Sequence, residues 1–80
     1  MSGTTKKLQD MITTIMEPDD EVKPEDLLTD NIGMASIDYV ELAVAIEKDF
    51  GVVVSQAFLA KGISLEELVQ YVDGAVHVTQ

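Results

Sequence analysis

The chain lacks cysteine, tryptophan and arginine, and only 5% of its residues are aromatic. Without cysteine it can form neither a disulfide nor a thiolate metal site, so any thiol chemistry requires a group added to the protein. Because aromatic residues are so few, the core must consist mainly of aliphatic side chains. No apolar run approaches the roughly 20 residues that span a bilayer, and no signal-like segment begins the chain. We therefore expect a cytoplasmic protein that has no membrane partner.

The chain is strongly acidic. Fifteen acidic residues oppose five lysines, which gives a formal net charge of −10, and eleven of the acids lie between Glu17 and Asp49. Nucleic acids and anionic membrane surfaces would be repelled, so neither is expected as a partner. Basic proteins are the expected partners, because complementary charge speeds encounter and orients docking. The alternative is that the charge only keeps a small domain soluble.

The length of 80 residues allows one domain, residues 1–80, with a small core. No catalytic dyad or triad can be assembled around His77, the single histidine. The acidic residues of the segment 17–34 do not have the spacing of an EF-hand loop. We therefore predict a non-catalytic protein that has neither catalytic residues nor a metal site.

Hydrophobic residues recur at intervals of three and four, which is typical of amphipathic helices. The short run Val52–Val54 is strand-like but has no partner strand, so we interpret it as an extended connector. The sequence predicts an all-α fold, a small four-helix bundle of three main helices and one short helix, with a long loop between the first two. The expected helices span residues 5–17, 37–50 and 56–61, and a last helix begins at residue 64.

Helix ends are marked by capping signals. Gly51 suits the end of the second helix, and Ser55 suits the start of the short third helix. Ser64 and Glu67 have the spacing of a capping box for the last helix. After Gly74 we expect the last helix to fray.

The predicted second helix has two apolar faces. At about 100° per residue, one face is wide enough to be the core face. The core-facing residues are Tyr39, Leu42, Ala43, Ile46 and Phe50. Ile37, Val40 and Val44 fall on nearly the opposite side, where they are flanked by Glu41, Glu47 and Lys48. A small bundle cannot easily bury both faces.

We interpret the second face as a docking surface for a partner with an apolar groove and a basic rim. The alternative is a set of scattered surface residues, with Val40 partly covered by the long loop. Hereafter the docking strip denotes the predicted docking residues Ile37, Asp38, Val40, Glu41, Val44 and Glu47.

The segment from Asn31 to Leu42 reads NIGMASIDYVEL. Gly33 permits a sharp turn, and Ser36 then stands where a helix N-cap is expected. A hydroxyl at this position faces unpaired backbone N–H groups and the positive end of a helix dipole, which suits a phosphate group. On position alone, however, a serine before a helix is most often only a structural cap.

This segment resembles the attachment site of acyl carrier proteins, whose usual form is DLGxDSLDxVEL, and the resemblance covers most of the chain. It implies that Ser36 carries 4′-phosphopantetheine, transferred from coenzyme A by a phosphopantetheinyl transferase with Mg²⁺. It also implies that acyl groups are held as thioesters on this arm. The implied partners are the transferase and acyltransferase- or ketosynthase-type enzymes with basic docking surfaces.

Three departures from the family pattern suggest a specialised fatty-acid or polyketide-type pathway with its own partner enzymes. Ala35 replaces the acid that normally precedes the serine, Asn31 replaces an aspartate, and the segment 55–61 lacks the acids common there. Two alternatives remain, an unmodified acidic helical adaptor for a basic partner and a peptidyl or aminoacyl carrier. The initial methionine and short ends favour a free-standing protein, which we expect to be a monomer.

Overall fold

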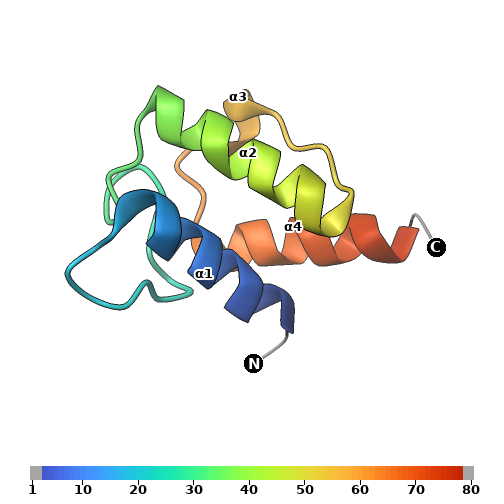
Figure 1. Cartoon of the computed structure of the whole chain (residues 1–80), viewed down its shortest axis with the longest axis horizontal. Coiled ribbons are helices and arrows are strands. Elements are labelled where there is room, and N and C mark those ends of the chain that lie inside the picture. The colour runs from blue at the N-terminus through green and yellow to red at the C-terminus, as the bar shows by residue number, and fades with distance from the viewer. Residues whose placement is uncertain (1–2, 79–80) are drawn as a thin grey trace.

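The computed structural model describes residues 3–78, which form four helices and no strand (Figure 1). The helices are α1 (Gly3–Met16), α2 (Ser36–Phe50), α3 (Gln56–Leu59) and α4 (Leu65–Val78). α1 packs against both α2 and α4, and α3 contacts α2. The predicted all-α bundle with one short helix is confirmed. No helix in the described range is long and apolar enough to cross a membrane.

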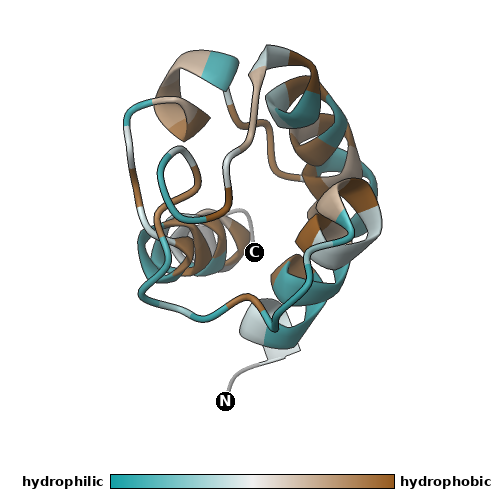
Figure 2. Cartoon of the chain, turned by 90° about the vertical axis from the view of Figure 1, so that its left-hand side faces the viewer, coloured by the Kyte–Doolittle hydropathy of each residue, from teal (hydrophilic) through white to brown (hydrophobic). Residues whose placement is uncertain are grey.

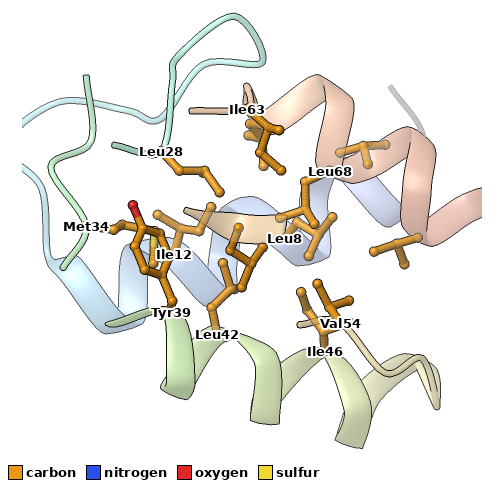
Figure 3. Packing of buried hydrophobic residues seen from close by; sticks show 14 of the residues in the cluster. Leu8, Ile12, Leu28, Met34, Tyr39, Leu42, Ile46, Val54, Ile63 and Leu68 are labelled. Carbon is orange, nitrogen blue, oxygen red and sulfur yellow. The ribbon is translucent and has the colours of Figure 1, made fainter. Parts of the chain in front are cut away.

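The core is aliphatic and lies between the three long helices. α2 contributes Tyr39, Leu42 and Ile46, which point into the same interior as Leu8 of α1 and Leu68 of α4 (Figure 3). The predicted core face of α2 is confirmed, since these three residues are buried and Ala43 and Phe50 pack against them. The fully buried side chains are Leu8, Ile12, Leu28, Leu42, Ile46, Leu59, Leu65, Leu68 and Val72.

The predicted caps of α3 and α4 form. The Ser55 hydroxyl accepts a hydrogen bond from the Phe58 N–H at 3.1 Å. The Glu67 N–H donates to the Ser64 hydroxyl at 3.2 Å, and the Ser64 N–H donates to the Glu67 carboxylate at 3.4 Å. α3 ends at Leu59, two residues before the predicted end at Lys61. These caps form as predicted because they depend on residues only three positions apart.

The prediction that the chain frays after Gly74 is wrong for residues 75–78, because α4 continues to Val78. Thr79 and Gln80, to which the prediction also applied, lie outside the described residues. Glycine costs up to about 1 kcal/mol in a helix interior, but tertiary contacts can outweigh this cost. Here Ala75 and Val76 pack against the core, and Asp73 accepts a hydrogen bond from the Thr4 hydroxyl of α1. His77 lies in this last turn, and its side chain falls outside the described part.

The connection between α1 and α2 lies at one end of the bundle and is mostly hydrophilic (Figure 2). It is held by backbone hydrogen bonds to the start of α4. The Leu28 N–H donates to the Ile63 carbonyl at 3.0 Å, and the Leu65 N–H donates to the Asp26 carbonyl at 3.0 Å. Buried Val22 and Leu28 add apolar contacts with the core. The predicted long loop is therefore ordered, and it brings the chain to a defined starting point for α2.

Tyr39 places a polar atom inside this apolar core. Its side chain is buried, and its hydroxyl has no hydrogen-bond partner among the residues that the structure describes. Figure 3 shows the ring pointing from α2 toward the interior near Met34. Burial raises the pKa of Tyr39 above 10.0, and the negative charges of Asp38 and Asp30 raise it further.

We expect Tyr39→Phe to raise the free energy of unfolding by about 1 kcal/mol, because an unpaired buried hydroxyl carries a desolvation cost. Below pH 10.0, the ordinary pKa, Tyr39 is protonated in both states, so its contribution does not vary with pH. Above that pH the unfolded tyrosine ionises first, so wild-type stability falls as pH rises toward the folded-state pKa.

Urea unfolding at neutral pH and at alkaline pH measures both effects of Tyr39→Phe. Tyr71→Phe is the matched control, because Tyr71 is exposed. A loss of stability in Tyr39→Phe that exceeds the loss in the control would show that the Tyr39 hydroxyl is hydrogen-bonded.

Candidate functional site

The candidate site is the entry of the chain into α2. Gly33 has φ +79°, a left-handed conformation that disfavours side chains with a Cβ. No atom lies within 4 Å of a Cβ built there, so the requirement for glycine is conformational rather than steric. The Met34 N–H then donates to the Leu28 carbonyl at 2.9 Å. These features fix the direction from which the chain reaches Ser36.

Asn31, which departs from the family pattern, has a structural role that was not predicted from the sequence. Its side-chain oxygen accepts a hydrogen bond from the Leu27 N–H at 2.9 Å, and its own N–H donates to the Leu27 carbonyl at 3.1 Å. Asn31 thereby closes the turn that precedes Gly33. Asparagine is a common turn residue for this reason, so local turn chemistry could have indicated the role.

The prediction that Ser36 is the N-cap of α2 is wrong, because the cap is Ala35 and Ser36 is the first helical residue. Ala35 is extended, with φ −108° and ψ 177°, and its side chain cannot act as an acceptor. The Asp38 carboxylate instead accepts a hydrogen bond from the Ala35 N–H at 2.8 Å. This bond forms half of a capping box, so the acid three residues along stabilises the helix start without a polar N-cap.

Ser36 is exposed at the start of a helix of 15 residues, and its hydroxyl makes no hydrogen bond within the described residues. The first-turn N–H groups of a helix have no partner inside the helix and carry a partial positive charge. In α2 the Asp38 N–H donates to the Ala35 carbonyl at 2.9 Å, so the remaining first-turn donors and the positive end of the helix dipole are what an anionic phosphodiester on the Ser36 oxygen would face. The geometry therefore fits a phosphate-linked group.

The apolar residues of the docking strip are exposed, which agrees with the predicted second face of α2. Ile37 is 68% exposed, Val40 39% and Val44 46%. Glu41 and Glu47 are exposed beside them and form no ion pair within residues 3–78. Asp38 differs, because it is half-buried and its carboxylate bonds to Ala35. Asp38 therefore stabilises the start of α2, and its carboxylate is already engaged in a hydrogen bond, unlike those of Glu41 and Glu47.

Comparison with known proteins places these features in a family. A family model described as a phosphopantetheine attachment site matches residues 6–72. The chain is 38% identical to an acyl carrier protein of Campylobacter fetus over 55 residues, which cover 69% of this chain and 71% of that protein. It is 36% identical to the acyl carrier protein AcpXL of Rhizobium meliloti over 53 residues, covering 65% of this chain and 56% of that protein.

These matches show that the chain belongs to the acyl carrier protein family, whose members bear phosphopantetheine as their prosthetic group. Within the described residues there is no cluster of three or more side chains that could hold a metal ion.

Proposed function

We propose that this protein carries acyl groups as thioesters on a 4′-phosphopantetheine arm attached to the Ser36 oxygen. The observation that supports this most strongly is the exposed, unbonded Ser36 hydroxyl at the start of α2, in a chain of the carrier family. The arm would supply the terminal thiol that the cysteine-free chain lacks. The protein itself would catalyse no reaction, and its role would be to hold the acyl group and present it to enzymes.

Two features of the chain support attachment at this serine. The ordered loop and the turn at Gly33 hold Ser36 at the surface, where a transferase can reach it. Asp38 directs its carboxylate back toward Ala35 at 2.8 Å, so it takes up one donor at the helix start and leaves the Ser36 hydroxyl free. Phosphodiester attachment at a helix start also gains from the positive end of the helix dipole.

The docking strip would bring partner enzymes to the arm. Its exposed valines and isoleucine begin one residue after Ser36, and unpaired acids rim them. A partner with an apolar groove and a basic edge fits this surface. The proposed partners are a phosphopantetheinyl transferase and acyltransferase- or ketosynthase-type enzymes. The departures at Ala35 and Asn31 support a specialised fatty-acid or polyketide-type pathway, and the proposed location is the cytoplasm.

The linkage of the bound acyl group tests this function. A broad-specificity transferase and acyl-coenzyme A should add one acyl-phosphopantetheine to the protein, visible by intact mass spectrometry. Neutral hydroxylamine should then remove the acyl group and leave the arm, because thioesters react readily with this nucleophile. An acyl group that resists hydroxylamine would contradict thioester carriage. If the chain takes up no arm at all, the acidic adaptor becomes the better account.

A further inference from the structure

The Tyr39 hydroxyl is a buried donor without a partner. The side chain is 5% exposed, and its oxygen meets no hydrogen-bonding atom within residues 3–78. Buried polar groups in folded proteins are nearly always hydrogen-bonded, so each exception needs an explanation. Phenylalanine would fill the same space without the cost of desolvating a hydroxyl, so packing alone does not account for the oxygen.

Tyr39 lies close to one helical turn from Ser36. Residues three apart are neighbours on a helix surface, and at 1.5 Å per residue these two are about 4.5 Å apart along the axis of α2. Ser36 is exposed, whereas the Tyr39 ring turns into the interior near Met34 (Figure 3). A group attached to the Ser36 oxygen therefore starts beside the place where the tyrosine enters the core.

The hydroxyl lies on the side of the core that faces the loop before α2. Figure 3 shows the end of the ring on the same side as Met34 and Leu28, which belong to the same buried cluster. Besides burial, the negative charges of Asp38 and Asp30 raise the pKa of Tyr39, and Asp30 is an exposed residue of this loop. The hydroxyl is therefore within electrostatic reach of the loop surface. Met34 has an unbranched, flexible side chain, which can move aside at a low energetic cost.

The Tyr39 hydroxyl is available as a donor at neutral pH. Because its pKa is raised, the phenol keeps its proton there and offers one O–H to an acceptor. The proposed arm contains amide carbonyls, and an acyl thioester adds further carbonyl oxygens. Attachment at Ser36 keeps these acceptors at a high effective concentration near Tyr39. The acceptor that the protein lacks is therefore supplied by the group that it carries.

We propose that the Tyr39 hydroxyl donates a hydrogen bond to a carbonyl oxygen of the group attached to Ser36. The inference rests on the proposed function and adds to it a binding residue inside the core. The oxygen belongs either to an amide of the arm or to the acyl group. In both cases, modification of Ser36 satisfies a polar atom that the unmodified protein leaves unpaired. Tyr39 thereby favours the modified form over the unmodified one.

Labelling of the tyrosine ζ-carbon with ¹³C tests this directly by NMR, because Tyr39 and Tyr71 are the only tyrosines of the chain. Spectra are compared for the unmodified protein, the form with the arm alone and the form loaded with a 3-oxohexanoyl group, each verified by intact mass. The Tyr39 signal should shift toward the phenolate position when its hydroxyl becomes a donor. The signal of exposed Tyr71 should stay unchanged. A shift with the arm alone assigns the oxygen to an amide, and a shift only after loading assigns it to the acyl group.

Tyr39→Phe, with Tyr71→Phe as the matched control, connects this signal to the hydroxyl. Modification should raise the urea midpoint of wild type and of the control by the same amount, and that of Tyr39→Phe by less. An equal rise in all three proteins would overturn the proposal. A modified wild type whose Tyr39 signal does not shift would refute this inference alone. Failure of the chain to accept phosphopantetheine would refute the carrier function, and this inference with it.

Discussion

Ser36→Ala should abolish attachment of phosphopantetheine, and with it all acyl loading, while leaving the protein folded. Alanine offers no oxygen for the phosphodiester bond, so the effect on carrier activity is complete. The effect on stability should be small, because Ala35 and not Ser36 is the N-cap of α2. Alanine is also the better helix former, which favours the variant by up to about 0.5 kcal/mol.

Urea unfolding of Ser36→Ala beside wild type measures the second half of this prediction. A free energy of unfolding within about 0.5 kcal/mol of wild type would show that the Ser36 hydroxyl does not stabilise the start of α2. A loss of about 1 kcal/mol or more would instead mark Ser36 as a helix cap. Residual acyl loading in the variant would show that another residue bears the group.

Val44→Asp should impair docking without unfolding the domain. Val44 is 46% exposed in the middle of the docking strip, so a carboxylate there stays hydrated in the free protein. Docking against an apolar partner surface would remove that water from the carboxylate, and this desolvation weakens binding. We expect kcat/KM of the phosphopantetheinyl transferase to fall about tenfold or more, which corresponds to about 1.4 kcal/mol of lost interaction. Steady-state kinetics with the variant as the varied substrate gives this ratio.

Two further aspartate variants complete the docking test. Val53→Asp introduces the same charge at a residue 74% exposed in the connector after α2, outside the docking strip, and should leave kcat/KM within about twofold of wild type. Ile46→Asp should unfold the protein, because Ile46 is fully buried and an unpaired buried charge costs several kcal/mol. Equal kinetic losses in Val44→Asp and Val53→Asp would contradict a specific docking strip.

The fold could be predicted where the determining residues are close in sequence. The core face of α2 follows from the spacing of Tyr39, Leu42 and Ile46, and the capping box from Ser64 and Glu67. The exposed face of α2 was likewise predictable, because a bundle of three long helices can bury only one side of each. Local periodicity and capping chemistry decide these features.

The start of α2 and the end of α4 could not be predicted from local sequence. The path into α2 depends on hydrogen bonds from Leu28 to Ile63 and from Leu65 to Asp26, which join distant parts of the chain. Continuation past Gly74 depends on packing of Ala75 and Val76 against the core. In both cases tertiary contacts override what a short segment favours by itself.

The candidate site itself was predictable in identity but not in geometry. The motif indicated Ser36, whereas the structure assigns the N-cap to Ala35 and the stabilising bond to Asp38. An alanine N-cap is uncommon, and a serine next to it is the more obvious candidate. The shift by one residue favours the proposed function, because it leaves the hydroxyl free of a capping bond.

The most direct measurement is the intact mass of the protein after incubation with coenzyme A, Mg²⁺ and a phosphopantetheinyl transferase, followed by fragmentation to locate any added group. A gain of one phosphopantetheine that maps to Ser36 is the result that this account predicts. No gain, or a gain that maps to another residue, would contradict it.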